Sequence, residues 1–307
     1  MTSLITNTAA MVALQTLSDI NSQLTETNNR ISTGYAIGSA RDSAAYWAIA
    51  TTTRSDNGAL ETVRDALALG EATMDVMYNG LDAVRDNLQE MKELLVAARQ
   101  PGVDRAAIQD QIAGLQTDMD NKATASVINE QNFLVVDSSD ADYNETRAIV
   151  ASFERSGTGI TVSTININID NIKLIDPNGG TEDGILDQTR TVGGTGRSVL
   201  DIDISTLTDA ADDLTDLEEM IGIVDAAMVD LIEAQNLVGT VLSRAESQQS
   251  FVSALIDAND RAVGALVDAD MEVESTRLRA LQTQQQLSVQ ALTIANTSAA
   301  NVLSLFR

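Results

Sequence analysis

The chain has 307 residues, of which 19 are Lys or Arg and 45 are Asp or Glu, so its formal net charge is −26. This excess of acid argues against nucleic acid and anionic membrane surfaces as partners, because both attract Lys and Arg. The chain has no Cys and no His, which excludes disulfides and zinc sites of the Cys/His type and removes the commonest general base. We therefore expect a protein that is not an enzyme and that holds no cofactor and no metal ion.

Residues 1–18 carry no charged side chain, and no basic residue precedes Arg30. A cleaved secretory signal needs a positively charged start, so export by that route is not expected. The region is predicted to form a helix. Its apolar stripe is Leu14, Leu17, Leu24 and Ile31, with Asn21 and Asn28 as polar members.

A long repeat follows, in which apolar residues alternate in steps of three and four from Leu60 to Leu95, with Gly70 as a weak member. This spacing predicts a coiled-coil-like helix. Pro101 and Gly102 end the helix. A shorter helix is then expected to fold back on it, with the apolar residues Ile108, Ile112, Leu115 and Met119.

A second repeat of the same kind runs from Leu214 to Ile256 and continues to Leu266. Neither helix can bury its stripe alone, because an isolated helix is marginal in water and depends on tertiary packing. The sequence therefore predicts one elongated helical bundle made from both halves of the chain.

The segment between the repeats has a different character. Residues 160–175 are rich in β-branched side chains and predict a strand, residues 192–196 predict a loop, and the alternation of Leu200, Ile202 and Ile204 with Asp201 and Asp203 predicts a second strand. Residues 137–219 carry 18 acidic and 5 basic side chains. This region lacks the Gly and Glu that a calcium loop needs at fixed positions, so we interpret it as a small, solvated, β-rich outer module.

The C-terminal segment is uncharged from Ala280 to Phe306. Its polar residues make it unsuitable as a membrane span. One apolar stripe keeps heptad spacing but is out of phase with the preceding helix near Asp270, which predicts a break there. This stripe is Met271, Leu278, Leu281, Leu292, Ala295, Ala299, Val302 and Phe306, and a second apolar row is Leu287, Ala291, Ile294 and Leu305.

The two ends of the chain have two possible partners. They can bury their apolar stripes against each other within one monomer, or they can pair with each other and also with further copies of the chain. The second row of the C-terminal segment favours assembly, because it would remain exposed in a monomer and large exposed apolar surfaces mark protein contacts.

Four motifs carry a family resemblance. RISTGYAIGSARDSAAYWAIA at residues 30–50, LQEMKELLVAARQ at 88–100, VINEQNFL at 127–134 and the final NVLSLFR occur in this order. Together they resemble segments of bacterial flagellins, and the Ala-Tyr-Trp sequence within the first is similar to the alphaproteobacterial type. The resemblance covers about residues 1–135 and 210–307.

The resemblance implies a mainly α fold, an elongated coiled-coil-like helical bundle of N- and C-terminal arms with a small β-rich middle module. The expected domains are an inner coiled coil from residues 1–45 and 270–307, a long-helix rod from 46–136 and 207–269, and the outer module from 137–206. It also implies a structural subunit that self-assembles through its terminal helices into the helical filament of a bacterial flagellum and serves swimming motility.

The implied location is extracellular, in the flagellar filament, after export unfolded through a type III apparatus. The implied partners are further copies of the chain, the flagellar export apparatus and its chaperone, and the hook-associated junction and cap proteins. A secreted junction or translocator-like protein is the alternative. The expected subunit-assembly residues are Leu4, Met11, Leu14, Leu17, Leu24, Ile31, Leu278, Leu281, Leu292, Val302 and Phe306.

The resemblance also implies two host-recognition segments. An innate receptor of animals engages a motif similar to Leu88, Gln89, Glu90 and Leu94, but this chain has Glu90 where the family commonly has Arg. The segment that plants sense aligns with residues 29–50, where Gly38 and Ser43 replace the common Asn and Asp. We therefore expect weak recognition by both kinds of host.

Overall fold

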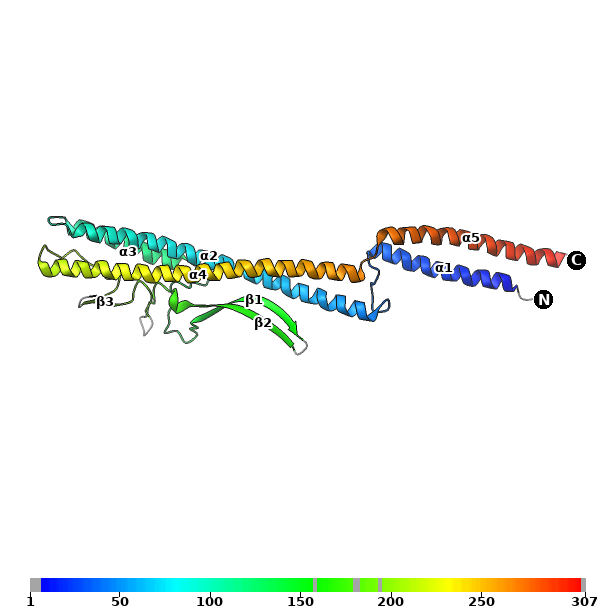
Figure 1. Ribbon diagram of the computed structural model, residues 1–307, viewed down its shortest axis with the longest axis horizontal. Helices are drawn as coiled ribbons and strands as arrows, with labels where there is room; N and C mark the ends of the chain where they lie inside the picture. The colour runs from blue at the N-terminus through cyan, green and yellow to red at the C-terminus, as the bar shows by residue number, and fades with distance from the viewer. Residues whose placement is uncertain (1–6, 157–158, 179–182, 193–194, 305–307) are drawn as a thin grey trace. The chain divides into compact units, whose positions relative to one another are not determined.

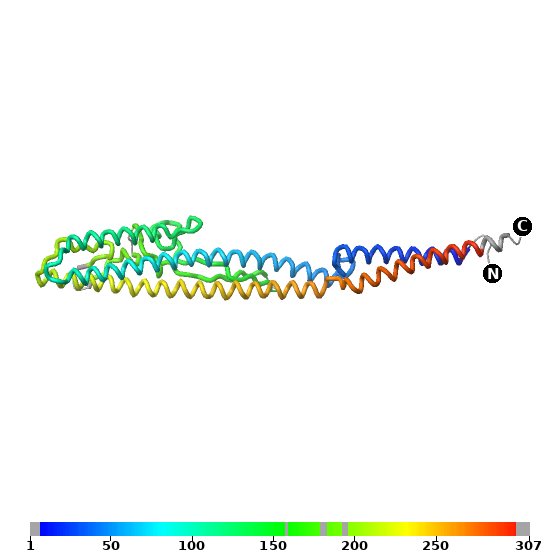
Figure 2. Tube along the Cα trace, turned by 90° about the horizontal axis from the view of Figure 1, so that it is seen from above, coloured from blue at the N-terminus to red at the C-terminus, as the bar shows by residue number. Residues whose placement is uncertain are grey.

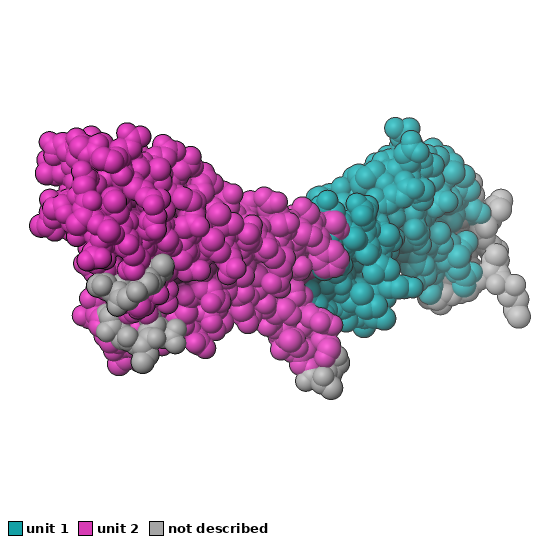
Figure 3. Space-filling model, turned by 60° about the vertical axis from the view of Figure 1, so that its left-hand side comes forward, with its two compact units in different colours: residues 1–58, 255–307 teal, residues 59–254 magenta. Residues whose placement is uncertain are grey.

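The computed structural model describes residues 7–156, 159–178, 183–192 and 195–304. Within these residues the chain is mainly α-helical, with two short hairpins in its middle region (Figure 1). The predicted fold class is thus confirmed. The chain divides into two compact units, unit 1 with residues 1–58 and 255–307 and unit 2 with residues 59–254 (Figure 3).

Two long helices supply residues to both units, α2 (Ala44–Ala98) and α4 (Ala211–Val267). In unit 2, every apolar side chain of the predicted repeat from Leu60 to Leu95 is at most 6% exposed. The structure explains why a glycine interrupts the repeat at position 70. The side chain of Ile149 occupies the space that a Cβ atom of this residue would need. The repeat of α2 is therefore a buried core, as predicted.

The repeat of α4 is only partly buried. Leu214, Ile221, Met228 and Leu242 are half-buried, whereas the members that alternate with them are at most 1% exposed. These are Leu217, Val224, Leu231, Val238, Ala245 and Val252. In unit 2, Lys92 of α2 forms an ion pair with Asp225 of α4, and Gln235 of α4 donates to Asp82 of α2 over 3.4 Å. These contacts place the two repeats side by side, as the sequence predicted.

Helix α3 (Arg105–Ala125) follows the turn at Pro101 and Gly102. It begins at Asp104, whose side chain accepts a hydrogen bond of 3.2 Å from the backbone N–H of Ala107, and such capping satisfies an otherwise unpaired donor. Ile108, Ile112 and Met119 are buried. Helix α3 carries its predicted apolar face inward, with Leu115 half-buried.

The middle region contains an antiparallel pair, β1 (Thr146–Ser156) and β2 (Gly159–Asn168), followed by the 3-10 helix η1 (Ile169–Asn171). The strand predicted at 160–175 is thus real but ends earlier. The loop predicted at 192–196 is partly wrong, because β3 (Arg190–Val192) and β4 (Thr195–Arg197) form a second hairpin. Residues 193–194 lie outside the described residues.

The strand predicted around Ile202 is wrong. Residues 200–204 form a turn and an irregular segment, although Ile202 and Ile204 are buried. Side-chain amides of α3 take the place of a neighbouring strand. Gln109 donates to the carbonyl of Ile202 and accepts from the N–H of Ile204, and Gln116 donates to the carbonyls of Val199 and Ile202, over 2.9–3.2 Å. Since the backbone groups are satisfied by side chains, no strand partner is needed.

The middle region also has a core of its own, centred on the fully buried Lys173. The ammonium group lies 3.1 Å from carboxylate oxygens of Asp170 and Asp176. Burial by itself would lower the pKa of Lys173, but the hydrogen bonds to Asp170 and Asp176 outweigh burial and raise the pKa. The middle region is therefore a packed part of unit 2, whereas the sequence predicted a solvated module without such a core.

Unit 1 contains α1 (Thr8–Thr33) and α5 (Met271–Ser304). Helix α1 ends at Gly34, whose φ of 76° is left-handed and therefore suits Gly. The carbonyl of Val267 at the end of α4 accepts hydrogen bonds from Ala36 and Ile37. Residues 268–270 separate α4 from α5, which agrees with the phase change expected near Asp270.

Candidate assembly surface

The terminal helices α1 and α5 lie antiparallel and side by side within unit 1 (Figure 1 and Figure 2). Along α1 the least exposed positions follow steps of three and four, and along α5 they do the same. Among the described side chains of the two helices, Ile20, Leu24 and Leu281 form a buried apolar cluster, with the partly buried Leu278 against it. We call α1 and α5 together the terminal helix pair.

Polar contacts hold the rest of the terminal helix pair. The amide of Asn7 donates to the carbonyl of Ala295 over 3.1 Å, and Gln285 donates to Asn21 over 2.7 Å. Arg30 lies 3.2 Å from Glu274, whose side chain is 9% exposed and whose Oε2 has no hydrogen-bond partner among the described residues. The buried Glu274 therefore fills an inner position that an apolar side chain occupies in a stable two-helix coiled coil.

Outside this thin seam, large apolar side chains of the terminal helix pair face solvent. Their exposed fractions range from 44% for Met271 to 68% for Ile294. We call this set the terminal apolar surface. Its members are Met11, Val12, Leu14, Met271, Val273, Leu287, Val289 and Ile294. Large apolar side chains that are exposed together on one pair of helices are typical of a contact with another protein surface.

The assembly residues predicted from sequence fall into several environments. Leu24 and Leu281 are buried inside the terminal helix pair, whereas Met11 and Leu14 are exposed. The others with described side chains, Leu17, Ile31, Leu278 and Leu292, are half-buried. Leu4 and Phe306 lie outside the described residues, and so does the side chain of Val302.

The predicted inner stripe of α1 was partly out of phase. Asn21 and Asn28 are exposed, and Ile20 and Thr27 take the inner positions instead. The reason is chemical, because this rotation buries an Ile and leaves two amide side chains in water. For α5, the prediction that the second row remains exposed in one chain is confirmed for Leu287, Ala291 and Ile294, whereas Leu305 lies outside the described residues.

Six members of the terminal apolar surface are absent from the assembly residues predicted from the sequence, and three of these six belong to neither apolar stripe named there. Val12 and Val289 do not share the heptad spacing of the stripes, so a search for those stripes passes over them, whereas Val273 lies two heptads before Leu287 and continues the second row of α5. The sequence pattern that could have identified these three valines was weaker than a heptad repeat. Each is an uncharged β-branched residue in a helix whose inner positions are already occupied by others.

Charge is distributed unevenly between the two units. Unit 1 has 10 acidic and 7 basic side chains, a net charge of −3, whereas unit 2 has 35 acidic and 12 basic side chains, a net charge of −23. Repulsion between like charges opposes close approach of two copies. The terminal helix pair therefore belongs to the unit that is electrostatically better suited to dense packing.

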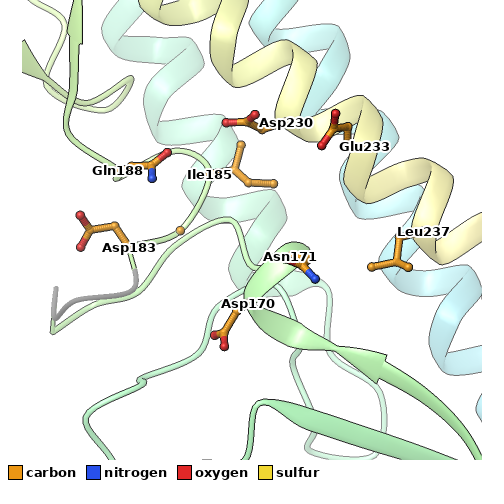
Figure 4. Close-up of a pocket in the computed structure, with 9 residues that line it drawn as sticks. Asp170, Asn171, Asp183, Ile185, Gln188, Asp230, Glu233 and Leu237 are labelled. Atoms are coloured by element: carbon orange, nitrogen blue, oxygen red, sulfur yellow. The ribbon is translucent and has the colours of Figure 1, made fainter.

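Unit 2 has an acidic hollow of about 460 Å³ between the middle region and α4 (Figure 4). Its lining includes Asp170, Asp183, Asp230 and Glu233. Arg190 pairs with Asp230 at 2.5 Å, and the described residues contain no group of three or more side chains placed to hold a metal ion. We assign no ligand to this hollow.

The receptor motif predicted on α2 presents a mixed surface. Leu88 is fully buried and Leu94 is half-buried, while Gln89 and Glu90 are exposed. The exposed carboxylate of Glu90 is thus available to a partner. Recognition of this motif by a receptor stays a prediction.

Within the described residues, no helix is long and apolar enough to cross a lipid bilayer. The fold and the surface together define a class of protein, a mainly α-helical subunit whose N- and C-terminal helices pair and leave apolar side chains exposed.

Comparison with known proteins gives the family within this class. Residues 4–136 match the bacterial flagellin N-terminal helical region, and residues 221–306 match the bacterial flagellin C-terminal helical region. The chain is 44% identical to Flagellin C of Rhizobium meliloti strain 1021, 36% to Flagellin A of Rhizobium meliloti and 37% to a flagellin of Brucella melitensis, with all of both chains covered each time. The chain belongs to the bacterial flagellin family, the structural subunits of the flagellar filament.

Proposed function

We propose that copies of this chain polymerise through the terminal apolar surface into the helical filament of a bacterial flagellum. The observation that carries this proposal is the set of exposed apolar side chains on the terminal helix pair. Identical subunits that meet through different surfaces form an open helical array rather than a closed ring. The filament then acts mechanically, as a stiff tube that transmits torque for swimming.

The energetics of the terminal helix pair support this proposal. Helices α1 and α5 have 26 and 34 residues, yet the buried cluster among their described side chains contains three apolar residues. Full burial of a Leu or Ile side chain contributes about 1.5–3 kcal/mol, so three such residues give little against the ordering cost of two long helices. Burial of the eight exposed side chains against neighbouring copies would supply the missing stabilisation.

The contact residues proposed for polymerisation are those predicted from the sequence together with the terminal apolar surface. Leu24 and Leu281 act indirectly in this scheme, because they fix the two helices against each other. Met11, Leu14, Leu287 and Ile294 would touch neighbouring copies directly. Leu4, Val302 and Phe306 remain proposed contacts from the sequence.

The finer properties of the family are proposed for this chain on the same basis. They are an extracellular location, export as an unfolded chain through the flagellar apparatus with its chaperone, and contacts with hook-associated junction and cap proteins. A purely structural role without catalysis is supported by the lack of His and Cys. The junction-protein alternative is less favoured, because the three relatives compared above are all named flagellins.

A single substitution tests the proposal. We expect Leu292→Asp to block filament growth while unit 2 stays folded, because a charge on the inner side of α5 cannot be buried without a partner. Purified chains are seeded with sheared filaments and imaged by electron microscopy, and far-ultraviolet circular dichroism reports the fold. Normal filaments from the Leu292→Asp variant would contradict the proposed role of α5.

A further inference from the structure

A second candidate contact lies in unit 2, where a shallow polar groove follows α4. It consists of two hollows of about 490 and 630 Å³ that share Ser243 and Arg244. One wall is Tyr78 of α2, and the other is the β1–β2 hairpin with Ser163 and Thr164. We call it the Arg244 groove. Both hollows are formed by residues of unit 2 alone.

The Arg244 groove contrasts in charge with the unit that contains it. Unit 2 has 35 acidic and 12 basic side chains, but no carboxylate lines either hollow. Eight of the twelve basic residues form ion pairs with carboxylates among the described residues. Arg244 is exposed and forms none there, so its guanidinium group is open to solvent with its donors free.

The lining chemistry specifies what the groove can receive. A guanidinium group presents several N–H donors in a fixed plane that matches the two oxygens of a carboxylate. The hydroxyl groups of Ser163, Ser243 and Ser247 are available beside it as further donors. A polar groove that contains one unpaired Arg and no carboxylate carries a positive charge and thus fits an acidic side chain that enters from outside.

We propose that the Arg244 groove binds a carboxylate on unit 2 of a second copy of this chain. The inference rests on the proposed polymerisation, and charge complementarity selects the occupant, since unit 2 offers a large excess of carboxylates over basic groups. A charge pair between copies would fix register and offset part of the repulsion between the acidic units. The groove would thus add a second contact to the one made by the terminal apolar surface.

Charge reversal at this position is the first test. We expect Arg244→Glu to raise the critical concentration for seeded filament growth by at least about tenfold, because like charges placed together cost more than 1.4 kcal/mol. Arg244→Lys keeps the positive charge and should change the critical concentration less. The matched control is Arg64→Glu, which changes charge equally at a half-buried arginine of α2 whose ion pair among the described residues is with its neighbour Asp65.

The two arginine variants separate this inference from the proposed function. If the unaltered chain polymerises and Arg244→Glu grows filaments as readily as Arg64→Glu does, the groove contact is wrong and polymerisation through the terminal helices still stands. If the unaltered chain does not polymerise, both proposals are overturned.

Cross-linking identifies the partner carboxylate directly. Filaments of the Arg244→Lys variant, grown from a mixture of ¹⁵N-labelled and unlabelled chains, are treated with a carbodiimide that joins an amine to a touching carboxylate. We expect a link between position 244 of one chain and an Asp or Glu of a differently labelled chain. The ion pair between Lys92 and Asp225 provides a link within one chain as the control. A Lys92–Asp225 link without any link from position 244 between chains would overturn the proposal.

Discussion

The long helices of unit 2 and the terminal helix pair of unit 1 are built on the same repeat, but only the former completes its core within one chain. In unit 2 the repeat of α2 from Leu60 to Leu95 has a third helix and the middle region to pack against, and its apolar members are buried. Among its described side chains, the terminal helix pair buries four apolar residues, Ala10, Ile20, Leu24 and Leu281, and exposes eight large ones. Heptad spacing therefore identifies helices that need a packing partner. Whether this partner lies in the same chain or in another copy depends on which other elements surround the helix.

The largest effect is expected where a charge is added to the exposed row of α5. Ile294→Asp should abolish filament growth while leaving the melting temperature of the isolated chain unchanged, because the side chain is 68% exposed before assembly and buried afterwards. Electron microscopy and a thermal melt measure the two properties. The control is Gln290→Asp, an exposed position in a polar row of α5. Equal filament loss in both variants would mean that added charge, rather than the apolar row, is responsible.

A substitution in the core of unit 2 should instead lower the stability of the chain. Lys173→Met leaves Asp170 and Asp176 without their buried cation, and breaking such a pair costs about 3–5 kcal/mol. Lys92→Met removes an exposed pair, which contributes about 0–1 kcal/mol, and is the matched control. Urea unfolding of both variants gives the comparison. A similar loss in both would show that Lys173 does not organise the middle region.

A smaller, pH-dependent effect is expected at Asp187 in the same region. Burial raises the pKa of Asp187, although hydrogen bonds from the backbone N–H groups of Asp176 and Gly184 partly oppose it. The folded state therefore holds this proton more tightly than the unfolded state, and stability falls as pH rises from the ordinary Asp pKa of about 3.9 through the raised value.

Asp187→Asn removes this loss while its amide oxygen can still accept from the backbone of Asp176. We expect the variant to be more stable than the unaltered chain at pH 7, with a difference that shrinks towards pH 4. Urea midpoints across this range measure it, beside Asp118→Asn on the exposed face of α3. An advantage that grows as the pH falls would contradict the sign.

The smallest effect is expected at the tight turn after α3. Asn129 and Glu130 have φ angles of 50° and 64°, and a two-residue turn of this kind favours Asn-Gly. Glu130→Gly should stabilise the chain by about 0.5–1 kcal/mol, because a left-handed backbone costs a residue with a Cβ atom about that or more. Glu130→Ala keeps the strain and serves as the control. Equal melting temperatures for the two variants would show that the turn is not strained.

Much of the helical fold could be predicted because its signals are local and repeated. The buried stripes of α2 and α4, the return of α3 and the break before α5 follow from spacing, from Pro101 and Gly102 and from a phase change in the repeat. The exposed second row of α5 could also be predicted, because a helix with two apolar rows and one partner leaves one row uncovered.

The middle region could not be predicted to the same degree, because its backbone is satisfied by distant side chains. Ile202 and Ile204 alternate like a strand, but Gln109 and Gln116 of α3 hydrogen-bond this segment instead. The burial of Lys173 likewise depends on Asp170 and Asp176 closing around it, which no spacing indicates. In α1, the choice between Asn21 and Ile20 for the inner position depended on how α5 packs.

The central claim is that the terminal helices propagate the filament. The most direct measurement is electron microscopy of the intact chain beside a chain that ends at Arg279, both with a salting-out sulfate that strengthens apolar association and with sheared filaments as seeds. The account predicts long, uniform filaments from the intact chain and none from the shortened one, which lacks Leu287, Val289 and Ile294. Filaments from both chains would contradict it.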